Sequence, residues 1–123
     1  KQFNCFLYAF GLHKQKDFLS NSCWTFSSDF VRGLFKLGVL KKEDRPVPDF
    51  IVYYEDEKGT ITHAGILESE NMVISKWSWG PVVRHRIWDV PVGYGDKIFF
   101  SRSPDDSRRN KIIKLAHSVL NKD

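Results

Sequence analysis

Cysteine is scarce in this sequence, and long apolar runs are absent. The 123 residues include two cysteines, Cys5 and Cys23, which are too few for a disulfide scaffold, although the sequence allows one bridge between them. No stretch approaches the roughly 20 consecutive apolar residues that a membrane-spanning helix needs. We therefore expect neither a disulfide framework nor a membrane partner.

Signatures of metal ions and phosphate-bearing cofactors are missing as well. The two cysteines and four histidines show no Cys-x-x-Cys or His-x-x-x-His spacing, and the sequence has no glycine-rich phosphate loop. We expect no metal and no cofactor. Any catalysis by this chain is then expected to rest on its own side chains.

Positive charge is only in slight excess over negative charge. Nineteen Lys and Arg residues stand against 15 Asp and Glu residues, which gives a net charge of +4. The basic residues are interleaved with the acidic ones along the chain, and this pattern argues against nucleic acid as the main partner.

Apolar and aromatic residues are abundant. They make up 41% and 15% of the chain, respectively, which is typical of a folded globule and not of a disordered tail. The length suits one domain with one proper core, so we expect a single domain over residues 1–123.

The spacing of the apolar residues predicts helices at both ends of the chain and strands between them. Helices are expected over residues 4–12, 27–37 and 103–120, and strands over 50–54, 60–67, 72–77, 82–87 and 97–101. The first helix begins after a capping Asn4, and the last begins in the segment 103–106, with a cap and Pro104 at the first helical position. This order predicts an α+β fold, with N-terminal helices on an antiparallel sheet of about five strands, plus a C-terminal helix.

The chain is organised around the stretch from Thr60 to Trp79, which carries His63 among small residues. Strand alternation predicts that His63 shares a buried face with Ile61, Gly65 and Leu67. Gly65 on that face indicates that another group comes close to it. The alternative interpretation is an ordinary core histidine.

Cys5 falls in the first turn of the first expected helix. The positive end of a helix and a nearby imidazolium both favour a thiolate, and a helix-borne cysteine facing a strand-borne histidine is the layout of a thiol hydrolase. The alternative for Cys5 is a buried structural thiol.

Two segments carry a resemblance to a known family. The segments 4–11 (NCFLYAFG) and 62–66 (THAGI) resemble the cysteine and histidine blocks of NlpC-type papain-like amidases. This resemblance implies a papain-like fold, Cys5 as the nucleophile, His63 as the base, and a third polar residue about a dozen positions later, where Ser75 stands. The segment 75–81, His85 and the segment 94–96 further resemble an uncharacterised bacterial group of NlpC-like domains, so that the likeness spans roughly residues 4–100.

A rival alignment exists within the same superfamily. The segment 22–27, which contains Cys23, is similar to the nucleophile segment of true papain proteases, and the segment 76–80 is similar to their asparagine-bearing segment. Trp77 stands where the asparagine is required, so we favour Cys5 over Cys23.

The implied mechanism is acyl transfer. The Cys5 thiolate attacks a carbonyl carbon, and His63 takes the thiol proton and later donates one to the leaving amine. A third group orients the imidazole, either Ser75 or His85, and the alternative for His85 is a solvent-facing strand residue. The Cys5 backbone N–H contributes to an oxyanion hole, with further donors to be sought among Gln2, Tyr8 and Gln15.

The remaining residues of interest are aromatic or basic. Trp77, Trp79 and Tyr94 either line a substrate groove or plug the end of a small sheet. Lys76 is expected to be a solvated or hydrogen-bonding strand residue, with a catalytic role as the minor option.

These features lead to one main functional hypothesis and two alternatives. The main hypothesis is a cysteine peptidase, amidase or deamidase that acts on a peptide or protein. Because the chain opens at Lys1 directly before its first motif, we expect a domain excised from a longer bacterial protein, such as a secreted effector or toxin with an inhibitory partner protein. The alternatives are a metal-free ribonuclease or nucleic-acid module using His63 and His85, and a catalytically inactive binding domain.

Overall fold

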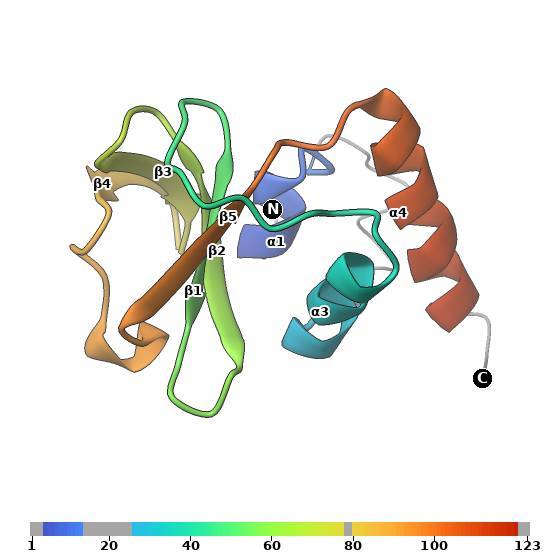
Figure 1. The fold of residues 1–123 in the computed structure, drawn as a ribbon, viewed down its shortest axis with the longest axis horizontal. Coiled ribbons are helices and arrows are strands. Elements are labelled where there is room, and N and C mark those ends of the chain that lie inside the picture. Colours follow the sequence, from blue (N-terminus) through green and yellow to red (C-terminus); the bar gives the residue numbers. More distant parts are fainter. Residues whose placement is uncertain (1–3, 14–25, 78–79, 121–123) are drawn as a thin grey trace.

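The computed structural model describes residues 4–13, 26–77 and 80–120. Within these ranges, three α-helices lie on one side of a five-stranded antiparallel sheet, and the segment 87–96 lies on the other side (Figure 1). The elements in chain order are α1 (Cys5–Ala9), α3 (Ser28–Lys36), β1 (Ile51–Glu55), β2 (Ile61–Leu67), β3 (Met72–Lys76), β4 (Val82–Arg86), the 3-10 helix η1 (Val92–Tyr94), β5 (Lys97–Ser101) and α4 (Asp106–Leu120). The predicted α+β arrangement is therefore confirmed.

The strand order across the sheet is β4-β3-β2-β1-β5. β1 pairs with β2 over its whole length and with β5 on its other edge, so β1 lies inside the sheet. The buried run of apolar and aromatic residues in β1 follows from this position, because both of its faces are covered. The ladder between β2 and β3 is short, and it pairs Ile66 with Ile74 and Leu67 with Val73.

A bulge in β2 corrects one expectation from the sequence. His63 pairs with Tyr54, but Ile61 pairs with Glu55, so Thr62 is an extra residue between the two pairs. The extra residue reverses the alternation at this point. Ile61 therefore lies in the apolar cluster on the helix side of the sheet, whereas His63 lies on the opposite face with Tyr54.

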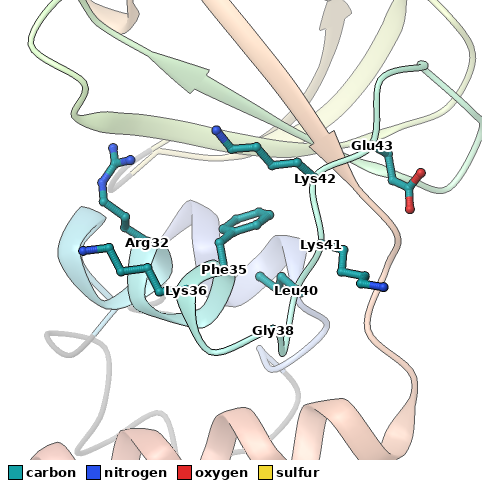
Figure 2. A pocket seen from close by; sticks show the side chains of 8 residues that line it. All are labelled: Arg32, Phe35, Lys36, Gly38, Leu40, Lys41, Lys42 and Glu43. Carbon is teal, nitrogen blue, oxygen red and sulfur yellow. The ribbon is translucent and has the colours of Figure 1, made fainter.

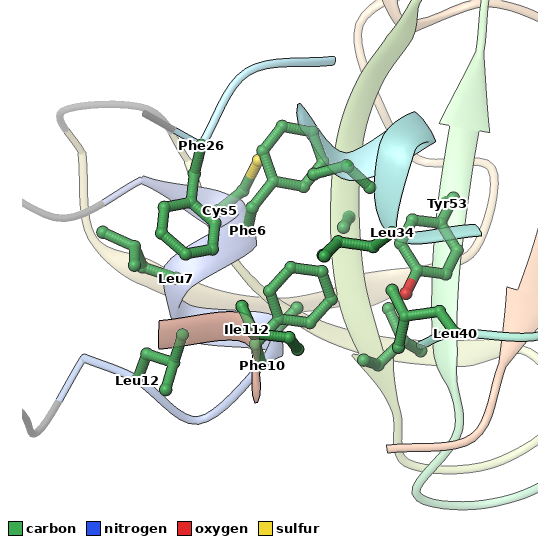
Figure 3. Close-up of a cluster of buried hydrophobic side chains, with 14 of the residues drawn as sticks. Cys5, Phe6, Leu7, Phe10, Leu12, Phe26, Leu34, Leu40, Tyr53 and Ile112 are labelled. Carbon is green, nitrogen blue, oxygen red and sulfur yellow. The ribbon is translucent and has the colours of Figure 1, made fainter. Parts of the chain in front are cut away.

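The two faces of the sheet bury two separate apolar clusters. On the helix side, side chains from α1, α3 and α4 pack against β1 and β2, as Figure 3 shows for Phe10, Leu34, Tyr53 and Ile112. The opposite face carries a smaller cluster, made of Val52, Tyr54, Leu67, Val73 and Phe100. Side chains that alternate along β1 are thus divided between the two clusters.

Helix ends agree with the capping signals in two of three cases. The Asn4 side chain accepts a hydrogen bond from the Leu7 N–H at 2.9 Å and caps α1, and Ser27 caps α3 in the same way. α4 begins later than expected, because the Asp105 carboxylate accepts the Arg108 N–H at 2.9 Å and does the capping that we assigned to the region of Ser103.

The C-terminal helix α4 buries only some of its apolar residues. Ile112 and Ala116 are buried against the core, but Val119 is 48% exposed. None of the helices in the described part of the chain has the length and apolar character of a membrane span.

Candidate functional site

Cys5 carries a free thiol at the first turn of α1 and is 8% exposed. The ladder with β1 bonds the Leu67 N–H to the Phe50 carbonyl, and the alternation of antiparallel bonds then directs the Ala64 N–H toward the β3 edge of β2. There the Ala64 N–H faces the Cys5 thiol and lowers its pKa. The thiol therefore lies at the edge of β2, beside the short ladder between β2 and β3.

Three backbone amides converge on the Cys5 sulfur. Besides Ala64, the N–H groups of Cys5 itself and of Phe6 stabilise its anionic form, as does the ammonium of Lys76. These groups do not outweigh desolvation, because burial raises the pKa of the thiol to about 11. The helix start does favour the thiolate, but with a pKa of about 11 the thiol form predominates at neutral pH.

His63 is 1% exposed and sits in an aromatic box on the face of the sheet opposite the helices. Its imidazole stacks on Tyr94, with ring centroids 4.6 Å apart, and meets Tyr54 at 5.7 Å and Trp77 at 6.1 Å. Burial, followed by the charge of His85, lowers the pKa of His63 to about 4. The imidazole is therefore neutral across the physiological range.

The aromatic box holds two polar atoms that are buried without a hydrogen-bond partner among the described residues, Nε2 of His63 and Nε1 of Trp77. Buried polar groups are normally paired, so two orphans in neighbouring rings are a feature that packing alone does not explain. An imidazole nitrogen without a partner keeps its capacity to accept or donate a proton.

Ser75 and His85 form a pair on the same face of the sheet. Nδ1 of His85 lies 2.7 Å from the Arg86 carbonyl oxygen, which can only accept, so Nδ1 carries the proton. Nε2 is then the acceptor for the Ser75 hydroxyl, 2.8 Å away. Ser75 is fully buried and His85 is 9% exposed, so His85 is not the solvent-facing residue that we considered.

The structure thus divides the site residues expected from the sequence into two groups. Cys5 and Lys76 interact at the edge of β2. His63, Ser75 and His85 lie together with the aromatic rings on the face of the sheet that is opposite the helices. No hydrogen bond joins Cys5 to His63 within the described ranges. The residues Cys23, Trp79, Gln2 and Gln15 lie outside the described residues.

Tyr94 links the two groups. Its pKa is raised, first by burial and then by its electrostatic interaction with Cys5, so the phenol lies near the sulfur while its ring stacks on His63. Thr62 holds Tyr94 in place by donating its hydroxyl to the Tyr94 carbonyl at 2.6 Å. The bulge residue of β2 therefore anchors the segment that covers His63.

Sequence reasoning missed three contributors to this site. Tyr54 packs on His63 and donates its hydroxyl to the Ile87 carbonyl, but in the sequence it is one residue of a buried strand. Thr62 gave no signal beyond its polarity, and the Ala64 N–H is a backbone group that no side-chain pattern reveals.

Gly65 has the close neighbour that its place in a strand indicated. A Cβ at this position would lie 2.9 Å from Cβ of Ser75 and closer still to Cγ1 of Val73. The glycine therefore lets β3 approach β2 beside the Ser75–His85 pair.

Within the described ranges, no group of three or more His, Cys, Asp or Glu side chains could hold a metal ion. Comparisons with protein-family models, curated proteins and solved structures found no match.

Proposed function

We propose that this protein is a thiol hydrolase that cleaves or modifies amide bonds of a peptide or protein, with Cys5 as the nucleophile. The observation that carries the proposal is a free, buried Cys5 in the first turn of α1, where the Ala64, Cys5 and Phe6 amides and the Lys76 ammonium lower the pKa of its thiol against the effect of burial. A structural thiol gains nothing from groups that stabilise its anion. A nucleophile that becomes an anion during the reaction does.

His63 is the general base of this proposal. It is neutral and its Nε2 has no partner among the described residues, so it can accept the thiol proton. The residue next to it in β2, Ala64, lowers the pKa of the Cys5 thiol through its backbone, so the base and the nucleophile are carried by neighbouring parts of the fold. Catalytic hydrogen bonds are often long in the free enzyme and tighten when substrate binds.

The proposed reaction transfers an acyl group first to Cys5 and then to water. The Cys5 S–H gives its proton to His63 as the sulfur bonds to the carbonyl carbon, and the carbonyl oxygen takes the negative charge, which the Cys5 N–H and Lys76 stabilise. Collapse of this intermediate breaks the C–N bond, and the amine leaves with the proton from His63. Water then adds to the thioester with His63 as base, which releases the acid and restores the thiol.

The resting state of this site differs from a thiolate–imidazolium pair. The Cys5 thiol has a pKa of about 11 and the His63 imidazole a pKa of about 4, so both groups are uncharged at neutral pH. Proton transfer therefore accompanies attack, and the neighbouring amides stabilise the anion as it forms.

A papain-like arrangement of the NlpC type is the finer fold assignment that we propose. It is supported by a cysteine at the first turn of a helix that packs on the sheet, and by a histidine on the adjacent strand.

Acyl transfer from p-nitrophenyl acetate tests the proposal without knowledge of the substrate. The protein is mixed with the ester near pH 7, and intact-mass spectrometry with peptide mapping locates the acetyl group. We expect a hydroxylamine-sensitive acetyl thioester on Cys5 that is abolished in Cys5→Ala, strongly slowed in His63→Ala and retained in Cys23→Ala.

Acetylation of Cys23 in place of Cys5 would refute the assignment of the nucleophile. Equal rates for the native protein and His63→Ala would refute the assignment of the base. Circular dichroism of each variant, recorded beforehand, ensures that only folded proteins are compared.

A further inference from the structure

A second feature of the surface lies away from Cys5, between α3 and the chain that follows it. It is an open cavity of about 720 Å³, lined by Arg32, Phe35, Lys36, Gly38, Leu40, Lys41, Lys42 and Glu43 (Figure 2). Its volume falls within the range of about 300–1,000 Å³ that is usual for ligand sites.

Positive charge dominates the wall of this cavity. Four of the eight lining residues are cationic and one is acidic. Arg32 forms an ion pair with Glu55 at 3.4 Å, and Glu43 forms an ion pair with Arg102 at 3.6 Å. Among the described residues, no carboxylate forms an ion pair with Lys36, Lys41 or Lys42.

Apolar surface lies beside these charges. Figure 2 shows Arg32 and Lys42 extending toward the same side of the cavity, with the Phe35 ring between them. The Phe35 ring is half-buried against Tyr53 and Phe99, and the ammonium of Lys42 lies 4.6 Å from the centre of the Phe99 ring. The site thus offers cations around an apolar floor.

Leu37 adds exposed apolar surface next to Lys36 in the chain. It follows Lys36 directly at the end of α3 and is 67% exposed. A large apolar side chain that is so exposed beside unmatched cations is typical of an interaction surface.

We propose that this cavity binds an acidic peptide segment of a partner protein. Carboxylates of the segment pair with Lys36 and Lys42, and an apolar side chain of the segment rests on Phe35. Nucleic acid fits less well, because Glu43 lies in the wall and because the arginines Arg84 and Arg86 are carried by β4, at the far edge of the sheet from this cavity.

Fluorescence anisotropy with three labelled probes of equal length tests the proposal. The first is a peptide of alternating Glu and Leu, the second replaces each Glu by Gln, and the third is a single-stranded oligonucleotide. We expect binding of the Glu peptide that weakens with salt, and at least tenfold weaker binding of the Gln peptide and of the oligonucleotide.

A matched pair of charge reversals locates the site. Lys36→Glu/Lys42→Glu should raise the Kd for the Glu peptide at least about tenfold, whereas Lys111→Glu/Lys114→Glu makes the same charge change on α4 and should alter it by less than about twofold. Equal loss in both variants would show attraction to net charge only. Tighter binding of the oligonucleotide, or no binding of the Glu peptide at millimolar concentration, would also overturn the proposal.

Discussion

The ring of Tyr94 lies stacked on the imidazole of His63, with ring centroids 4.6 Å apart and planes inclined by 23°. The Thr62 hydroxyl secures this arrangement by bonding to the Tyr94 carbonyl. The aromatic cover removes water from His63 and keeps it neutral, and the same tyrosine lies within electrostatic range of the Cys5 sulfur. Tyr94 therefore couples the proposed base to the proposed nucleophile.

The neutrality of His63 predicts a pH dependence of stability. Its pKa falls from 6.5 to about 4 on folding, so the unfolded chain binds the proton more tightly. The resulting stability, about 3 kcal/mol, is fully present above pH 6.5 and is lost as the pH falls toward 4. Urea unfolding between pH 4.5 and 7.5 measures it.

His63→Gln is the comparison for this measurement. The variant has no titrating group at position 63, so the free energy of unfolding of the native protein should rise more steeply between pH 4.5 and 6.5 than that of the variant. Parallel curves would mean that His63 titrates normally in the folded state.

The ionisation of the Cys5 thiol should affect its reactivity and the stability of the protein at alkaline pH. Its pKa rises from 9.0 to about 11 on folding, so at pH 8 the folded protein holds about 100-fold less thiolate than the unfolded chain. We expect Cys5 to react with iodoacetamide correspondingly more slowly in buffer than in urea, and stability to fall as the pH rises from 9 to 11. Peptide mapping of the alkylated protein measures the rate at Cys5 separately from that at Cys23.

Rapid alkylation of native Cys5 at pH 8 would contradict the neutral resting pair. It would instead indicate a stable thiolate, as the position of Cys5 at a helix start alone had predicted.

Local patterns were sufficient to predict the order of the helices and strands. The continuous apolar run around Tyr53 predicted a buried strand, and Asn4 predicted the start of α1. The face on which Ile61 lies was not predictable, because one extra residue at Thr62 reverses the alternation. The later start of α4 was also missed, since Ser103 and Asp105 are both good caps and packing chooses between them.

The candidate site was predictable only in part, for a physical reason. Residue types identified Cys5 and His63, but the net effect on a pKa depends on how completely the group is desolvated, and burial depends on the whole fold. The hydrogen bond from the Ala64 amide to the sulfur depends on which edge of β2 the N–H faces, and this requires the register of the ladder with β1.

Gly65 offers a direct test of the packing between β2 and β3. Gly65→Ala would place a methyl group against Val73 and Ser75, and we expect it to reduce the free energy of unfolding by about 1–3 kcal/mol. Gly33→Ala is the control, because it lies inside α3 with no atom within 4 Å of the added Cβ. That substitution should stabilise the protein by about 0.5–1 kcal/mol. Two variants of equal stability in thermal or urea unfolding would contradict the close approach at Gly65.

Ser75 can be tested for a structural or a catalytic role. Because its hydroxyl bonds to His85, Ser75→Ala leaves Nε2 of His85 buried without a partner and should cost about 1–3 kcal/mol of stability. The rate of acetylation of Cys5 should stay within about twofold of the native rate, since His63 is untouched. Ser69→Ala, in an exposed turn, is the control and should change neither quantity. A large loss of rate at unchanged stability would make Ser75 the orienting residue of the catalytic group.

Lys76 provides the final test, because it separates electrostatic support of the sulfur from mere packing. Its ammonium favours the anionic form of Cys5, so Lys76→Met should lower the rate of acetylation of Cys5 about tenfold, which corresponds to about 1.4 kcal/mol of lost stabilisation of the forming anion. Lys76→Arg keeps the charge and should retain most of the rate. Lys97→Met, at an exposed position of β5, removes a charge far along the sheet and should have no effect. If Lys76→Met and Lys76→Arg slow the reaction equally, the shape of the side chain matters and its charge does not, and the assigned role of Lys76 is wrong.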